Sequence, residues 1–237
     1  MTWLWWREVL RFFRQPNRVV GALATPMLFW LVIGSGFGGS FRGASYLGYL
    51  YPGSAVLILL FAAIFSTISI IEDRREGFLQ GVLASPIHRS AIVLAKVLGG
   101  VTVATLQAGL FLALAPAAGV TVTVTTVGLA LAAFVATSFA MTGLGLLMAW
   151  KMESTQGFHA VMNLFLMPMW MLSGALFPID TAPAWVRAAA AANPLHYGYR
   201  AVESALRGEV AVAGFGVVAG FGLVMLIAGT ALASARD

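Results

Sequence analysis

Two long apolar runs flank the charged stretch Glu72-Asp73-Arg74-Arg75-Glu76-Gly77-Phe78-Leu79-Gln80-Gly81-Val82-Leu83-Ala84-Ser85-Pro86. Five consecutive charged residues open this stretch, although only 10% of the chain is Asp, Glu, Lys or Arg. Scarce charge gathered beside apolar residues at helical spacing indicates a segment presented to water. The main functional question is therefore what docks on this segment.

Composition places the chain in a membrane. It has 237 residues, of which 60% are hydrophobic, and its mean hydropathy is +0.89. A soluble domain of this size needs far more polar surface to cover its core. Apolar stretches of about twenty residues recur, each long enough to cross a hydrocarbon layer roughly 30 Å thick. We expect a single, all-α, integral membrane domain over residues 1–237.

Turn and cap signals divide the chain into elements. Pro16 ends a first amphipathic helix, whose basic residues include Arg7 and Arg11. Asn193-Pro194 reads as an N-cap followed by proline at the first helical position, and Gly208 ends the helix that follows. We expect a loop at 38–50, an interfacial helix at 3–15, short external helices at 183–207, and spans at 19–37, 51–71, 91–114, 124–149, 157–177 and 210–234.

Lysine and arginine counts set the expected orientation. With the N-terminus inside, four of them lie outside: Arg42, Arg187, Arg200 and Arg207. Ten lie inside: Arg7, Arg11, Arg14, Arg18, Arg74, Arg75, Arg89, Lys96, Lys151 and Arg236. The positive-inside rule places both termini and the charged stretch in the cytoplasm, with the protein in the inner (plasma) membrane. The N-terminus lacks the pattern of a cleaved signal peptide.

Several chemical functions lack the residues that they need. The chain has no Gly-x-x-x-x-Gly-Lys-Ser/Thr phosphate loop, so we expect no ATP hydrolysis by that route. It has no cysteine, and His88, His159 and His196 are far apart, so no metal site is expected. No carboxylate pair lies inside a predicted span. The +5 charge and pI near 10.1 fit cytoplasmic loops better than nucleic-acid binding. We expect neither an enzyme nor a bound cofactor.

The charged stretch permits two interpretations from spacing alone. Its apolar residues recur at helical spacing after Glu76: Phe78, Leu79, Val82 and Leu83. Gly77 and Gly81 share another face, where a partner's backbone can approach closely. The segment is therefore either a docking helix or an interfacial helix that rests on lipid with solvated charges.

Two motifs resemble one known family. The pattern Glu72-x-x-Arg75-x-Gly77-x-x-Gln80-x-x-Leu83-x-x-Pro86, ahead of Lys96, resembles the first cytoplasmic loop of ABC-2 type transporter permeases. The stretch Met171-Leu172-Ser173-Gly174-Ala175-Leu176-Phe177-Pro178, then Asn193-Pro194-Leu195-His196-Tyr197, is similar to the external region of the same family. Phe78 and Gln80 depart from it, since the family usually has a small hydroxyl residue and often Glu at these positions.

The resemblance implies a mechanism of coupling to a separate ATPase subunit. Residues 74–85 are expected to form a coupling helix received by a groove on that subunit, which holds ATP and magnesium. Residues 3–15 become a connecting helix, and two copies of the chain form a homodimer within the lipid bilayer. The expected ATPase-coupling residues are Glu72, Arg75, Glu76, Gly77, Phe78, Leu79 and Leu83.

The same resemblance implies that the second and fifth spans line the substrate pathway. The candidates there are Ser66, Thr67, Met162, Asn163, Phe165 and Met169. Asn163 has an alternative role in an interhelical hydrogen bond, and the methionines have one in adaptable packing or, less favoured, a copper pathway. The external motif comprises Ser173, Gly174, Pro178, Asn193, Pro194 and Tyr197.

The expected function is export of a hydrophobic or amphipathic compound, drug-like or lipidic. Export of a polysaccharide or lipid-linked glycan is the alternative within the family. Outside it, an ATP-independent channel or carrier and a membrane scaffold stay open, whereas an intramembrane enzyme lacks the required polar constellation.

Overall fold

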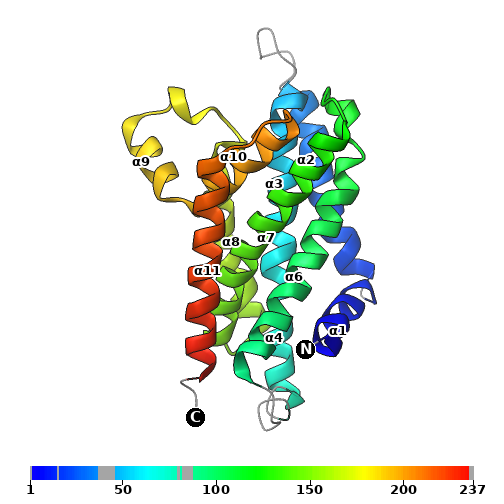
Figure 1. The fold of residues 1–237 in the computed structure, drawn as a ribbon, viewed down its shortest axis with the longest axis vertical. Coiled ribbons are helices and arrows are strands. Elements are labelled where there is room, and N and C mark those ends of the chain that lie inside the picture. The colour runs from blue at the N-terminus through cyan, green and yellow to red at the C-terminus, as the bar shows by residue number, and fades with distance from the viewer. Residues whose placement is uncertain (1, 15, 37–45, 79–80, 82–87, 235–237) are drawn as a thin grey trace.

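The computed structural model describes residues 2–14, 16–36, 46–78, 81 and 88–234 as a bundle of helices, without a strand in those ranges. The helices are α1 (Thr2–Phe13), α2 (Pro16–Gly36), α3 (Tyr46–Ser66), α4 (Ile68–Arg75), α6 (Arg89–Leu112), α7 (Val124–Lys151), α8 (Thr155–Trp170), α9 (Ala184–Ala192), α10 (Pro194–Leu206) and α11 (Val212–Ser234). The all-α fold class is therefore confirmed (Figure 1).

The centre of the bundle is α3, which is apolar on every side. Most of the apolar part of Tyr46–Arg75 is buried. A helix that is hydrophobic all round needs neighbours all round, and α2, α6, α7 and α10 supply them. Trp30 from α2 packs edge-on against Tyr51 at 5.5 Å, and Tyr51 stacks on Phe111 of α6 at 4.8 Å.

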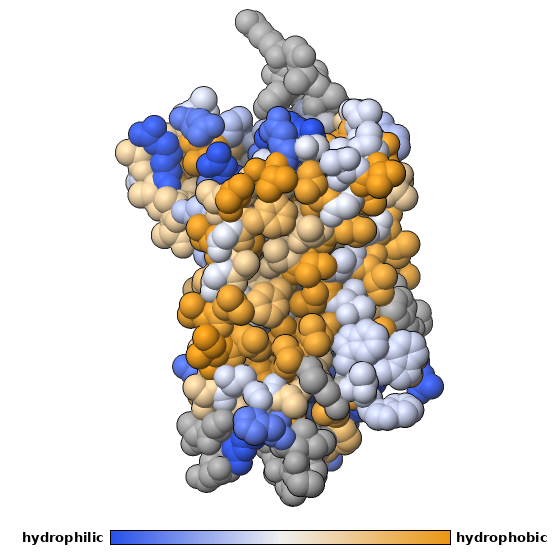
Figure 2. All heavy atoms as spheres, in the orientation of Figure 1, coloured by the Kyte–Doolittle hydropathy of each residue, from blue (hydrophilic) through white to orange (hydrophobic). Residues whose placement is uncertain are grey.

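Five described helical segments are long and apolar enough to cross a membrane. They are Tyr46–Arg75, Arg89–Leu112, Val124–Lys151, Thr155–Ala175 and Val212–Ala233. Within α2 the apolar part is the shorter Leu23–Gly36. Figure 2 shows apolar residues across the middle of the visible face, with hydrophilic residues towards both ends. A lipid bilayer has an apolar middle layer between two polar surfaces, and the protein surface has the same distribution. The chain is therefore a multi-pass membrane protein.

The structure corrects two predicted boundaries. The loop expected at 38–50 is wrong for residues 46–50, which are the first turns of α3. They are helical because Tyr46 and Leu50 are buried, and the carbonyl of Leu47 accepts a hydrogen bond from Trp30 Nε1 at 2.8 Å. The fifth predicted span closes with a π-helical turn over Met171–Ala175 rather than continuing to residue 177.

The amphipathic helix α1 lies beside α6 at the lower end of the molecule in Figure 1, which we call the α1 end. Val9 is buried, and Trp5 Nε1 donates to Thr102 Oγ1 at 3.0 Å. Gly99 permits this approach, because a Cβ atom there would lie 2.7 Å from Glu8 Cβ. The helix is thus held against the bundle by packing as well as by charge.

Candidate functional site

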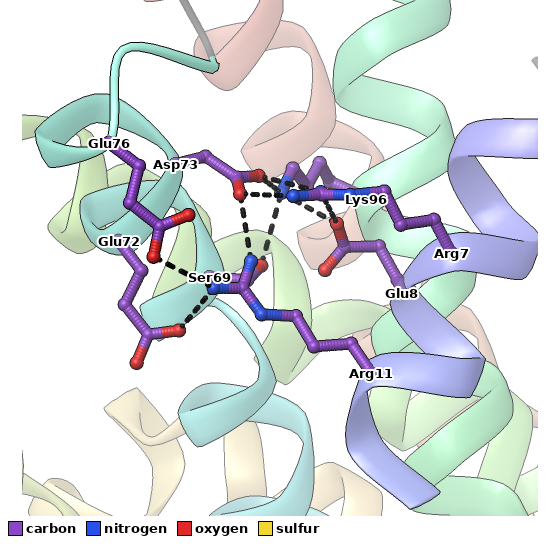
Figure 3. A network of polar contacts seen from close by, with 8 residues as sticks. All are labelled: Arg7, Glu8, Arg11, Ser69, Glu72, Asp73, Glu76 and Lys96. Atoms are coloured by element: carbon purple, nitrogen blue, oxygen red, sulfur yellow. Dashed lines mark hydrogen bonds and ion pairs between the residues drawn. The ribbon is translucent and has the colours of Figure 1, made fainter. Parts of the chain in front are cut away.

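One fully buried carboxylate organises the α1 end. Asp73 in α4 has no exposed side-chain surface. Its Oδ1 accepts hydrogen bonds from Arg7 Nη2 and Arg11 Nη1, each at 2.8 Å, and its Oδ2 accepts one from Arg7 Nη1 at 3.1 Å. Lys96 Nζ of α6 donates to the same Oδ2 (Figure 3). Asp73 thus joins α1, α4 and α6 at a single point.

Further carboxylates complete what we call the Asp73 cluster. Lys96 Nζ also donates to Glu8 Oε1 at 2.8 Å and to Ser69 Oγ at 3.2 Å. Arg11 Nη2 lies 2.9 Å from Glu72 Oε2 and 3.8 Å from Glu76 Oε1. The cluster comprises Arg7, Glu8, Arg11, Ser69, Glu72, Asp73, Glu76 and Lys96.

Mutual compensation explains how so many charges tolerate burial. A buried ion pair stabilises only where each charge has several good partners, and an isolated buried charge is costly. Lys96 and Glu8 have only 7% and 9% of their side chains exposed, and they pair with each other. The hydrogen bonds to Asp73 raise the pKa of Arg7 above its ordinary value.

Helical spacing brings these groups together. Ser69 and Asp73 are four residues apart on α4, as Arg7 and Arg11 are on α1, so each pair shares one helical face. Because α4 follows α3 after a short break at Thr67, Asp73 lies at the foot of the central span. The basic face of α1 is therefore turned to carboxylates of the same chain.

Five of the seven predicted coupling residues belong to the part of the chain that the structure describes, and two do not. Glu72 and Glu76 contact Arg11, and Arg75 is exposed. Gly77 has φ +76°, a left-handed conformation that favours glycine, and it follows the end of α4. Leu79 and Leu83 lie outside the described residues.

The boundary expected for the coupling helix, 74–85, is wrong at its start. Arg74 and Arg75 form the last turn of α4 instead. Arg74 is held there by the end of α7, because it donates to the carbonyls of Trp150 at 2.8 Å and Met152 at 3.2 Å. The turn at Gly77 then separates α4 from the segment that follows.

Phe78 begins that segment and contacts α1. The guanidinium carbon of Arg7 lies 3.9 Å from the centre of the Phe78 ring, a cation–π distance, and 37% of Phe78 is exposed. The segment after α4 thus begins against the same arginine that binds Asp73.

Sequence reasoning missed Asp73 and Glu8 as site residues. In the sequence, Asp73 is one residue of the charged stretch, and its neighbours rather than Asp73 itself carry the family pattern. A signal existed, since Asp73 follows Ser66 and Ser69 at seven- and four-residue spacing on one face. The cations that compensate the buried carboxylate lie on α1 and α6, and spacing within α4 cannot identify residues of other helices.

A cavity of about 310 Å³ adjoins the cluster. Glu8, Arg11 and Ser69 line it, and the remaining lining is mostly apolar. It includes Thr25, Pro26 and Phe29 from α2, Leu57, Phe61, Phe65 and Ser66 from α3, Gly99, Gly100 and Val103 from α6, and His159 and Met167 from α8.

The six predicted pathway residues do not meet at one place. Ser66 lines the cavity, whereas Thr67 is buried with its Oγ1 donating to the Ile64 carbonyl at 2.6 Å. Met162 is buried inside the bundle. On α8, Asn163 is exposed, as is 61% of Phe165. Met169 is half-buried, and its carbonyl accepts a hydrogen bond from Asn193.

The predicted external motif surrounds the π-helical turn at the other end of the bundle. Asn193 Nδ2 donates to the Met169 carbonyl at 2.6 Å, and His196 Nδ1 lies 2.7 Å from the Ser173 carbonyl. The Gly174 carbonyl accepts from Tyr49 Oη at 2.9 Å. Ser173 Oγ donates to the Trp170 carbonyl at 2.6 Å. Side chains thus satisfy carbonyls that the irregular turn frees, as a membrane interior requires.

The rest of that motif shapes the helices beyond the turn. Asn193 caps α10 by accepting from Leu195 N at 3.0 Å, and Pro194 occupies the first turn, which confirms the predicted cap. Gly208, with φ +78°, follows the end of α10, as expected. Tyr197 Oη donates to the Ala191 carbonyl at 3.0 Å, and Pro178 is exposed. Among the described residues, no group of three His, Asp or Glu side chains is arranged to hold a metal ion.

Comparison with known proteins agrees with this architecture. The chain is 28% identical over 199 residues to nodulation protein J of Rhizobium leguminosarum bv. trifolii, an alignment that covers 82% of this chain and 76% of that protein. It is 26% identical over 214 residues to the daunorubicin resistance ABC transporter permease protein DrrB1 of Streptomyces coeruleorubidus, covering 89% and 75%.

A third relative matches over a shorter region. The chain is 26% identical over 147 residues to the "Probable multidrug ABC transporter permease YbhR" of Escherichia coli K12, covering 60% of this chain and 39% of that protein. The sequence model of the ABC-2 type transporter family matches residues 1–206. That match covers the Asp73 cluster, the central span and the external motif, so the chain belongs to the ABC-2 type transporter family.

Proposed function

We propose that the chain is the permease subunit of an ATP-driven exporter, acting as a homodimer with a separate ATPase subunit. ATP and magnesium would bind to that partner. The observation that carries the proposal is the Asp73 cluster, which lies at the foot of the central span and contacts Phe78, one of the expected coupling residues. A partner that displaces this segment would act on α1, α4 and α6 together.

A chain of contacts connects Phe78 to the central span and could transmit a movement between them. Phe78 packs on Arg7, Arg7 binds Asp73, and α4 continues into the buried helix α3. Because ion pairs bridge three helices, movement at Phe78 is delivered to the central span rather than absorbed by the turn at Gly77. Closure of two ATPase subunits would then switch the dimer between inward- and outward-facing states.

An exposed face of α8 supports the homodimer. Gln156 and Asn163 are seven residues apart, so they share this face of α8, and both are exposed. Polar side chains in a span rarely face lipid, and they are usually turned to another helix or a polar pathway. A second copy of the chain, seated against α8, would cover them.

The cavity supports an apolar or amphipathic substrate. Phe29, Phe61 and Phe65 supply its aromatic surface, and most of its other lining residues are apolar. The names of two relatives point the same way, since they describe multidrug and daunorubicin resistance permeases. We propose that the protein works in the inner membrane with both termini in the cytoplasm, as the distribution of lysine and arginine favours.

Co-purification from native membranes tests this function. The native chain is expected to capture an ATPase subunit, and the complex in lipid vesicles to hydrolyse ATP faster when an apolar drug-like compound is added. Phe78→Ala should weaken capture or stimulation, because it removes both an exposed aromatic surface and the contact with Arg7.

The matched control is Leu223→Ala, which truncates a residue 53% exposed on α11. It should leave capture and stimulation unchanged. Absence of any captured ATPase would overturn the proposed function and favour a channel, carrier or scaffold.

A further inference from the structure

The cavity beside the Asp73 cluster lies within one protomer. Near their far ends α2 and α3 are joined, because Trp30 packs against Tyr51 and donates to the Leu47 carbonyl. Closer to α1, Gly21 and Thr25 of α2 line open space. A Cβ atom at Gly21 would meet nothing within 4 Å. Residues of α1, α2, α3, α4, α6 and α8 of a single chain line the cavity, and Asn163 of α8 is not among them.

Glu8 and Arg11 of α1 line one end of the cavity, and the further polar residues of its lining are Thr25, Ser66, Ser69 and His159. Glu8 and Arg11 there have opposite charges, and both are already paired within the Asp73 cluster. A ligand therefore meets no uncompensated charge from them, and a charged ligand would disturb the existing pairs. An uncharged polar group fits this end better than an ion.

Ser69 offers a hydrogen bond to such a group. Its Oγ accepts from Lys96 Nζ at 3.2 Å, and a hydroxyl that accepts in this way retains its own proton to donate. Ser66 is different, because its proton goes to the Ala63 carbonyl at 2.7 Å. The preferred ligand group is consequently an acceptor, such as a carbonyl or ether oxygen, near Ser69.

We propose that this cavity binds an uncharged molecule with an aromatic or apolar body and an acceptor oxygen at one end. The body packs against Phe29, Phe61 and Phe65, and the oxygen faces Ser69. The inference rests on the proposed function for its role as a substrate site. Because Glu8, Arg11 and Ser69 belong to both the cavity and the Asp73 cluster, an occupant touches the groups that hold α1, α4 and α6 together.

Benzophenone is a suitable probe, since it is uncharged and aromatic, carries one carbonyl, and inserts into nearby C–H bonds under ultraviolet light. The purified full chain in lipid vesicles is irradiated with benzophenone, and mass spectrometry maps the modified peptides. Labelling should concentrate on residues 57–69 of α3 and α4 and on 21–29 of α2. Lipid-facing α11, where 66% of Ile227 is exposed, should be labelled less.

Filling the cavity supplies the decisive comparison. Gly21→Trp should reduce labelling of 57–69 severalfold, because the indole enters open space. The matched control is Gly216→Trp on α11, where a Cβ atom also meets nothing within 4 Å, and it should change nothing. Thr25→Trp is a second filling variant in case the first fails to fold. Labelling that follows lipid exposure and ignores both filling variants would overturn the proposal.

Two further readouts identify the kind of molecule that occupies the cavity and distinguish failure of the cavity proposal from failure of the proposed function. Competition by the uncharged lipid monoolein would identify a membrane lipid as an occupant, whereas labelling that persists would favour a transported compound, and both outcomes require the site. Because labelling needs no ATPase, its success with no ATPase captured would refute the proposed function alone. Its failure in a complex that transports would refute the cavity site alone.

Discussion

At the scale of single residues, Asp73 determines how the α1 end is built. Its carboxylate is the only group shared by Arg7, Arg11 and Lys96 in the described contacts. A carboxylate has two oxygens and about four acceptor sites, so it can serve three cationic donors at once. An amide of the same shape lacks the charge and replaces acceptors with donors.

We therefore predict that Asp73→Asn destabilises the protein by about 3–5 kcal/mol, the usual cost of breaking a buried ion pair. Hydrogen exchange across residues 2–13 should rise, because α1 loses its main anchor. Thermal unfolding in detergent and exchange mass spectrometry measure the two effects.

The control for this variant is Asp180→Asn, which makes the same chemical change at an exposed position. It should alter neither quantity. Equal stability of the two variants would show that the remaining carboxylates compensate the cations without Asp73.

At the scale of elements, the junction between α8 and α10 depends on side chains that replace backbone hydrogen bonds. Asn193 serves both helices, because it caps α10 and donates to the Met169 carbonyl in α8. The Ser-Gly and Asn-Pro motifs thus have a structural explanation, independent of any ligand.

We predict that Asn193→Ala costs more stability than an ordinary cap, which contributes about 0.5–2 kcal/mol. The comparison is with Thr123→Ala at the start of α7, since Thr123 caps that helix through contacts near in sequence. Thermal unfolding of both variants measures the difference. If the two losses were equal, the hydrogen bond to Met169 would contribute nothing.

At the scale of the whole molecule, most of the exposed surface of the spans is apolar, and α8 departs from this. Its exposed face combines Asn163 with apolar neighbours such as Phe165, whereas α11 exposes mainly apolar residues to the lipid. In the homodimer that we propose, the second copy packs on α8, whereas α11 faces lipid.

We accordingly predict that Asn163→Leu weakens self-association by about 1 kcal/mol, the usual scale of an interhelical hydrogen bond in a membrane. Energy transfer between labelled copies in vesicles, followed as protein is diluted into lipid, measures it. Leu223→Ala on α11 is the control and should leave association unchanged. Unchanged association in both variants would locate the dimer contact elsewhere.

Much of the fold followed from local pattern. Apolar runs, Pro16, the Asn193-Pro194 cap and Gly208 located helices and their ends, because length, hydropathy and capping act within a few residues. The loop predicted at 38–50 is wrong for residues 46–50, which are helical and contact α2 and the carbonyl of Leu176, just beyond the π-helical turn. The start of the coupling helix failed similarly, because Arg74 is fixed by carbonyls of α7.

The sequence by itself determined a membrane-embedded, all-α chain of the ABC-2 type transporter family, because these properties depend on composition and on motifs close together along the chain. Only the tertiary structure decided that Asp73 binds Arg7, Arg11 and Lys96, and that the cavity shares Glu8 and Arg11 with this cluster. The physical reason is that a buried charge must be compensated by whatever lies beside it in space, and residues 66 or more positions away in sequence supply part of that compensation.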